Sequence, residues 1–191
     1  ATELFKTLES QCGDKVLNFS SGYCADYGDY YGVNARNWYI ALDADASNGE
    51  FIFEVQTSLD ATDIIGTYEF ASTKEVGTAI AGNLEDDNMV GSYWCMMDDD
   101  GYYMLDYSFI ASGSVTISKT GDNYTIVVDA IDEHGHKITV NYEGALEMEN
   151  RTGVASLSAH TNSANQLSPI SKTSKRNFLP TGALIKRNIV R

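Results

Sequence analysis

The sequence predicts an all-β protein, either an antiparallel β-sandwich or a calycin-like barrel of about nine to ten strands. Short segments in which apolar and polar residues alternate recur along the chain, and turns rich in Gly, Asp and Asn separate them. The composition agrees, because 12 tyrosines, 7 phenylalanines and 2 tryptophans favour strands. No helical segments lie between the strands, as they would in a parallel sheet with helical crossovers.

The best-defined part of the predicted sheet is a meander over residues 113–148. Gly, Asp and Asn at 120–123 and 132–136 suit the tight turns of two hairpins. Gly144 interrupts the alternation before a fourth strand, which we expect to continue the meander from Leu146. Alternation predicts one inward-facing row, consisting of Val115, Ile117, Tyr124, Ile126, Val128, Ala130, Ile138, Val140 and Tyr142.

The chain before the meander supplies the remaining strands, preceded by a short helix or edge segment over residues 2–11. The hairpin 36–43 and 50–57 directs Trp38, Ile40, Leu42, Phe51, Phe53 and Val55 inward. The segment 89–97 is apolar at both odd and even positions, so we predict one strand that is covered on both faces. The other predicted strands are 16–19, 64–70 with a bulge at Gly66, and 102–110, while 72–88 is mostly loop.

Charge divides the chain into an acidic β domain over 1–150 and a basic, Ser/Thr/Asn-rich tail over 151–191. All 27 acidic residues lie at or before Glu149, together with 6 of the 13 Lys and Arg. We expect the tail to be flexible or to dock, in part, on the acidic body or on a partner. An acidic body repels phosphates, which argues against nucleic acid as a partner, and no segment is apolar enough for a transmembrane helix.

The three cysteines are Cys12, Cys24 and Cys95, an odd number that permits one internal disulfide. We predict that Cys24 pairs with Cys95, because both lie in predicted strands.

Aromatic residues are more numerous than one inward row requires. Tyrosine and tryptophan offer flat apolar faces with a polar group, which suits stacking on sugars. They could equally fill the core and a second covered face. The candidate ligand-binding residues are Tyr30, Tyr31, Trp38, Trp94 and Tyr102.

Two polar clusters are candidate metal sites. Asp98, Asp99 and Asp100 could offer carboxylates to Ca²⁺, although a solvated hairpin tip is the simpler interpretation. His134 and His136 could begin a zinc site, but no third ligand is placed to complete it. No nucleophile–base motif occurs, so no catalytic residue is predicted, and calcium is the one cofactor that the sequence suggests.

Several motifs resemble the all-β domains of unknown function in Bacteroidetes cell-envelope lipoproteins. The resemblance covers about residues 23–148 and is carried by GDYYG (28–32), NWYIALD (37–43), GTYEF (66–70), SGSVTISKTGDNYTIVVDA (112–130) and YEG (142–144). It implies an exported protein in the periplasm or on the outer cell surface, with a lipid anchor in the full-length precursor. The first residue here is Ala1, whereas a lipidated cysteine begins such mature proteins.

These observations favour a non-enzymatic exported β module that acts as a binding or structural component of the envelope. A polysaccharide or another small polar molecule is the preferred partner. A calycin-type carrier of small molecules, with a ligand inside the barrel, is an alternative. A hydrolase that uses paired carboxylates is a further one.

Overall fold

The computed structural model describes residues 13–43, 49–85, 88–98 and 104–153 of the chain. All regular structure in these residues is β, in thirteen strands, and no helix occurs among them. The predicted all-β class is therefore confirmed. The predicted segment 2–11 and the tail beyond residue 153 lie outside the described residues.

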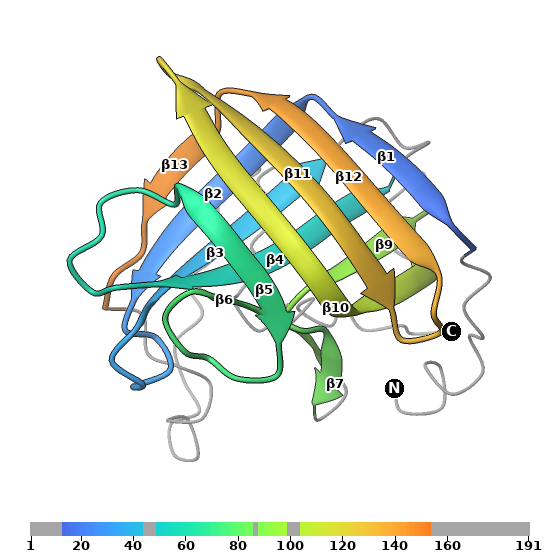
Figure 1. Ribbon diagram of the computed structural model, residues 1–191, viewed down its shortest axis with the longest axis horizontal. Helices are drawn as coiled ribbons and strands as arrows, with labels where there is room; N and C mark the ends of the chain where they lie inside the picture. The colour runs from blue at the N-terminus through green and yellow to red at the C-terminus, as the bar shows by residue number, and fades with distance from the viewer. Residues whose placement is uncertain (1–12, 44–48, 86–87, 99–103, 154–191) are drawn as a thin grey trace, which may run out of the picture.

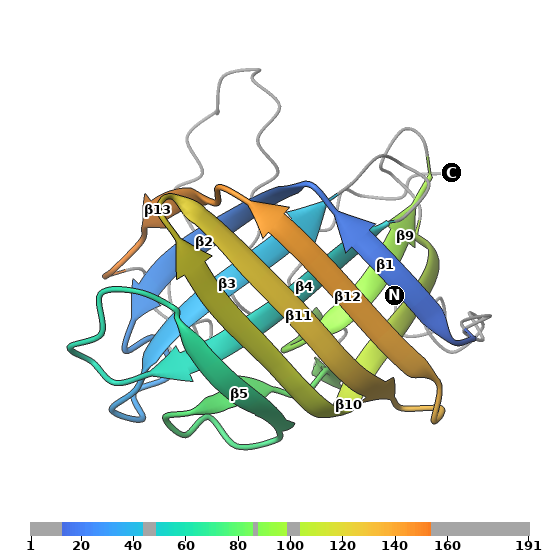
Figure 2. The ribbon, with the colours of Figure 1, turned by 45° about the horizontal axis from the view of Figure 1, so that its top comes forward.

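The strands close into a barrel whose two walls cross (Figures 1 and 2). The front wall in Figure 1 consists of β5 (Gly66–Ala71), β10 (Met104–Thr120), β11 (Asn123–Asp132), β12 (Lys137–Gly144) and β1 (Lys15–Phe19). The rear wall consists of β4 (Glu50–Thr57), β3 (Arg36–Asp43), β2 (Ser21–Gly28) and β13 (Glu147–Asn150). β6 (Thr78–Ile80) and β9 (Tyr93–Met97) connect the walls, and β7 (Asn83–Glu85) and β8 (Asn88–Val90) form a separate hairpin.

The two walls are joined on both sides. On one side only Ser20 separates β1 from β2, and β1 pairs with β12 while β2 pairs with β3. On the other side β9 pairs with both β10 and β4. β5 and β6 bridge the remaining halves of the same two strands. The strands therefore enclose one core.

The interior of the barrel is apolar, and its predicted rows are confirmed. β11 alternates strictly between exposed and buried residues over its ten positions. Trp38 of β3, Phe53 of β4 and Val128 of β11 are examples of side chains that point into the core. Burial of these rows is the main favourable term in folding, and it fixes the register because a one-residue slip would expose every row.

Strand boundaries differ from prediction where glycines bend the chain. The two strands predicted over 102–110 and 113–118 form one long strand, β10, which bends at Gly113 with φ of 105°. A Cβ at Gly113 would lie 2.2 Å from the carbonyl oxygen of Asp129, so only glycine fits. The bend lets the first half of β10 pair with β9 and the second half with β5.

The opposite correction applies to the single strand predicted over 89–97. It is split into β8 and β9 at Gly91, where φ is 70° and a Cβ would lie 2.2 Å from the carbonyl oxygen of Ala81. The segment 72–88, predicted as mostly loop, contains β6, β7 and the start of β8. These strands have only three residues each, too short for a visible alternation.

The sheet is not wholly antiparallel. β1 pairs parallel with β12, β13 pairs parallel with β2, and β5 pairs parallel with β6. The prediction that the strand after Gly144 continues the meander is therefore wrong, because β13 crosses to the other wall. Leu146 lies in the connection between β12 and β13, and its side chain is buried.

A second apolar layer lies on the outer side of the rear wall. We call it the outer layer, and it joins residues of β2, β3, β4, β8 and β9 with the loop before β3. Its buried members are Ala25, Tyr27, Tyr30, Tyr39, Ala41, Ile52, Met89, Tyr93 and Cys95. The prediction that strand 89–97 is covered on both faces is confirmed for β9, where Trp94 faces the interior and its neighbours face the outer layer.

The predicted disulfide between Cys24 and Cys95 is absent. Both residues are buried, and they are not bonded to each other. Cys24 belongs to the barrel interior and Cys95 to the outer layer, so the barrel wall separates them. Assigning both to strands was correct, but alternation within each strand decides the face, and the faces differ.

Candidate functional site

Four polar side chains meet on the outer face of the rear wall, and we call them the carboxyl–amide cluster: Glu54, Gln56, Asn37 and Tyr31. Strand alternation places the first three there. Phe53 and Val55 enter the core, so the residues between and after them face outward. The register of β3 and β4 sets Asn37 opposite Gln56 and two positions away from the pair that contains Glu54, on the same face.

The cluster is a chain of hydrogen bonds that ends on one carboxyl oxygen. Oε2 of Glu54 accepts a bond from the Tyr31 hydroxyl at 2.8 Å and one from Nδ2 of Asn37 at 2.9 Å. Oδ1 of Asn37 in turn accepts from Nε2 of Gln56. Each donor thus orients the next group, and the three strand residues hold one another rigidly.

Two acceptor atoms of the cluster have no donor. Oε1 of Glu54 and Oε1 of Gln56 are buried and accept no hydrogen bond from the described residues, and the same is true of the Tyr93 hydroxyl. Glu54 and Gln56 are each 0% exposed. A buried polar atom without a partner costs about 1–3 kcal/mol, so such atoms are rare without a reason.

Burial raises the pKa of the Glu54 carboxyl from 4.5 to about 8. Hydrogen bonds from Tyr31 and Asn37 oppose this rise, as do the charge of Lys74 and the nearby amide of Gly91. Loss of solvation outweighs all of them. Glu54 is therefore mostly protonated at neutral pH, and its carboxyl can act as donor as well as acceptor.

Tyr31 reaches the cluster from the loop between β2 and β3. The Asp29 carboxylate shapes this loop by accepting bonds from the amides of Val33 and Asn34. The ring of Tyr31 contacts that of Tyr30 edge to face, with centroids 5.0 Å apart. The Lys74 ammonium lies 4.2 Å from the centroid of the Tyr31 ring. Tyr31 is partly exposed, so it stands between the buried Glu54 and solvent.

The structure brings together only some of the predicted ligand-binding residues. Tyr30 and Tyr31 lie side by side in the outer layer. Trp38 and Trp94 point into the barrel and are 4% and 1% exposed, so they offer no face to a ligand outside the barrel. Tyr102 lies outside the described residues, as do Asp99 and Asp100 of the predicted calcium site; Asp98 is described. No group of three metal-ligating side chains is found within the described ranges.

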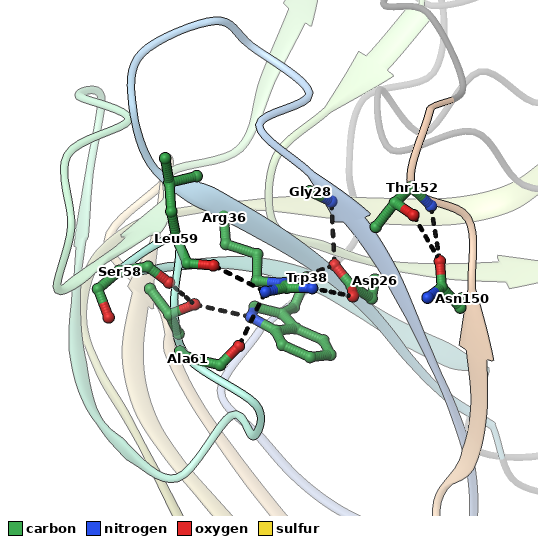
Figure 3. A network of polar contacts seen from close by, with 10 residues as sticks. Asp26, Gly28, Arg36, Trp38, Ser58, Leu59, Ala61, Asn150 and Thr152 are labelled. Carbon is green, nitrogen blue, oxygen red and sulfur yellow. Dashed lines mark hydrogen bonds and ion pairs between the residues drawn. The ribbon is translucent and has the colours of Figure 1, made fainter.

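A second polar network holds the barrel end near the β4–β5 connection (Figure 3). Arg36 makes a bidentate pair with Asp26, with Nε 3.0 Å from Oδ1 and Nη2 2.8 Å from Oδ2. Its Nη1 donates to the carbonyls of Leu59 and Ala61. This network fixes the loop that covers the core, which fits a structural role.

The same loop is held from the front wall by Lys119 and Tyr124. Both side chains donate to the Asp63 carboxylate, at 3.0 and 2.9 Å. Partial burial alone would raise the pKa of Asp63, but these bonds and the Ile64 amide lower it below its ordinary value. Ile64 follows directly and is fully buried in the core.

The two histidines of the β11–β12 turn are organised by Asp132 and not by a metal-ligand set. Oδ1 of Asp132 accepts from the amides of His134 and His136, and Oδ2 lies 3.1 Å from Nδ1 of His136. Ser108 also donates to Oδ2 at 2.8 Å. Burial would raise the pKa of Asp132, yet these bonds lower it.

Sequence reasoning missed Glu54, Gln56 and Asn37. In an ordinary hairpin, polar residues that alternate with apolar ones face water, so the pattern does not mark these three side chains as buried. The one signal of a covered outer face was β9, apolar at both parities, which pairs with β4 beside Glu50 and Ile52.

Comparison with known protein families, curated proteins and solved structures finds no match for this chain. Within the described residues, no helix is long and apolar enough to span a membrane.

Proposed function

We propose that this protein is a non-enzymatic binding module that takes a carbohydrate or a similar hydroxyl-rich molecule at the carboxyl–amide cluster. The observation that carries the proposal is a pair of buried oxygens, Oε1 of Glu54 and Oε1 of Gln56, that have no hydrogen-bond partner among the described residues. Hydroxyl groups of a ligand, which both donate and accept, would supply the missing partners. A ligand group that satisfies buried polar atoms binds specifically, because analogues lacking it leave those atoms unpaired.

The side chains around the cluster support a sugar over a purely apolar ligand. Carboxyl and amide groups can donate to and accept from hydroxyls, and they are fixed by mutual bonds before a ligand arrives. Tyr30 and Tyr31 supply aromatic surface beside them. In this proposal the ligand contacts the loop that carries Tyr30 and Tyr31 and the outer face of β4, and it does not contact Trp38 or Trp94.

The side chains that bond the Glu54 carboxyl are a tyrosine and an asparagine, and the amide of Gly91 lies nearby, so its direct partners are those of a binding site. A glycosidase acts through two carboxyl groups about 5–9 Å apart, and a second carboxyl at that distance from Glu54 would favour hydrolysis. An exported location in the bacterial envelope, lipid-anchored in the full-length precursor, is part of the proposal and is supported by the motif resemblance over 23–148.

A glycan array tests the function. We expect the wild-type protein to bind a defined group of glycans, and Glu54→Gln to weaken that binding by about tenfold or more, because the amide nitrogen in the place of Oε1 only donates, whereas the hydroxyl of the protonated carboxyl both donates and accepts. Glu143→Gln is the matched control, since Glu143 is exposed on β12. Silence of the wild-type protein on the array, or equal binding by Glu54→Gln, would contradict the proposal.

The calycin-type carrier is the second candidate. The closed barrel with an apolar interior favours it, because such interiors hold small ligands in other barrels. A bound apolar ligand would contact Trp38 and Trp94, so titration with an apolar fluorescent probe should quench their emission. The glycan proposal predicts no saturable quenching, because these side chains fill the interior.

A further inference from the structure

We propose that Tyr31 gates the carboxyl–amide cluster, and that its hydroxyl occupies the place which a ligand hydroxyl takes on Glu54. This inference rests on the proposed function for the identity of the ligand. The gating itself is a property of the protein alone and can be tested without one.

Tyr31 differs from the other members of the carboxyl–amide cluster because it lies in a loop and they lie in strands. Asn37 and Gln56 belong to paired strands and cannot leave without breaking the sheet. Tyr31 belongs to a loop bounded by Gly28 and Gly32, both with positive φ, and it bonds the cluster through one hydroxyl. It is the member that can move at low cost.

The hydroxyl of Tyr31 also has the same hydrogen-bonding chemistry as a ligand hydroxyl. It donates to Oε2 at 2.8 Å, as a sugar hydroxyl would, and it leaves Oε1 without a partner. A ligand that replaces it could bond both carboxyl oxygens and so gain more than the loop loses. The Lys74 ammonium lies over the Tyr31 ring, so the open state requires that contact to break as well.

Carbodiimide labelling of carboxyl groups with an amine, read by mass spectrometry at pH 6, tests the gate. Glu54 is protonated there and reactive once reached, and the exposed Glu143 in the same sample gives the reference rate. We expect slow labelling of Glu54 in the wild type. Tyr31→Phe should raise the rate about five- to tenfold, the factor that loss of one buried hydrogen bond implies. Tyr31→Ala should raise it further.

Tyr30→Phe is the matched control, because it removes the hydroxyl of the neighbouring tyrosine in the same loop and leaves the hydrogen bond from Tyr31 to Glu54 in place. Its labelling should equal that of the wild type. Equal Glu54 labelling in Tyr31→Phe and the wild type, or an equal rise in Tyr30→Phe, would overturn the gate. If the Tyr31→Ala variant does not fold, the comparison of Tyr31→Phe with Tyr30→Phe still tests the gate.

The outcomes separate the gate from the function. If Glu54 is labelled faster in Tyr31→Phe but the protein binds no glycan on the array, the gate is supported and the proposed ligand class is refuted. Glycan binding that depends on Glu54, with labelling unaffected by Tyr31→Phe, keeps the function and removes the gate.

Discussion

The two faces of the rear wall, built from the same strands, solve the burial of polar groups in opposite ways. On the inner face, Nε1 of Trp38 donates to Oγ1 of Thr57, and across the core the Tyr68 hydroxyl of the front wall donates to the Ile64 carbonyl. On the outer face, Glu54 and Gln56 each keep a buried oxygen that has no donor among the described residues.

This difference indicates which face is scaffold and which is specialised. A core that satisfies every polar group gains stability from burial alone. A layer that leaves acceptors empty and raises a carboxyl pKa to about 8 is less stable than an apolar equivalent would be. Groups of this kind concentrate at binding and catalytic sites, and the cluster is our candidate on that ground.

The largest expected effect is in the interior. Phe53→Ala should lower the free energy of unfolding by about 3–5 kcal/mol, because it leaves a cavity in a fully buried row. Val127→Ala, at a site 43% exposed on β11, should cost below about 1 kcal/mol. Urea denaturation measures both. A small loss for Phe53→Ala would show that the interior is loosely packed and would favour the carrier.

Glu54→Gln should stabilise the protein increasingly as the pH rises. The folded state keeps the Glu54 proton up to about pH 8, whereas the unfolded state loses it near 4.5, so the wild type loses stability between these values. The gain of Glu54→Gln over wild type should grow by about 2–3 kcal/mol from pH 5.5 to pH 7.5. Urea denaturation at both pH values measures it, and a constant difference would refute the raised pKa.

Asp132→Asn tests a buried carboxylate of the opposite kind. Its pKa is lowered by hydrogen bonds, so its contribution is present above the ordinary value of 3.8 and is lost as the pH falls. We expect a loss of about 1–3 kcal/mol at pH 7. Asp129→Asn, on the exposed face of the same strand, should change stability by less than about 0.5 kcal/mol. Equal losses of stability in the two variants would show that the hydrogen bonds of Asp132 do not stabilise the turn.

Arg36→Lys should have the smallest effect, about 1 kcal/mol, because lysine keeps the charge but not the bidentate pair and the two carbonyl bonds. Hydrogen exchange should accelerate in the 58–65 connection. The pH dependence attributed to Glu54 should be unchanged, since this network lies at the barrel end. A changed Glu54 titration would mean that the two regions are coupled.

The sequence was informative wherever one pattern decides one property. The rows of β11 and β12 and the hairpin β3–β4 were predicted residue by residue, because alternation along a strand is set locally. The predicted pairing of Cys24 with Cys95 is wrong because alternation within their strands directs Cys24 into the barrel and Cys95 into the outer layer.

The candidate site could be predicted only in part. Tyr30 and Tyr31 stood out because Tyr-rich loops are unusual, and they do lie beside the cluster. Trp38 and Trp94 stood out equally and lie in the core. Residue type marks a side chain as able to stack on a ligand, but burial on one face or the other decides whether it is available.

By itself, the sequence determined the all-β class, the strand rows and the turns, since these depend on neighbours within a few residues. Tertiary structure alone decided that the walls close, that β13 crosses to β2, and that the outer face of β4 is covered. Closure and covering depend on contacts between segments far apart in the chain. Glu54 is an ordinary outward-facing residue in the sequence and becomes a buried acid with a pKa of about 8 only because of those contacts.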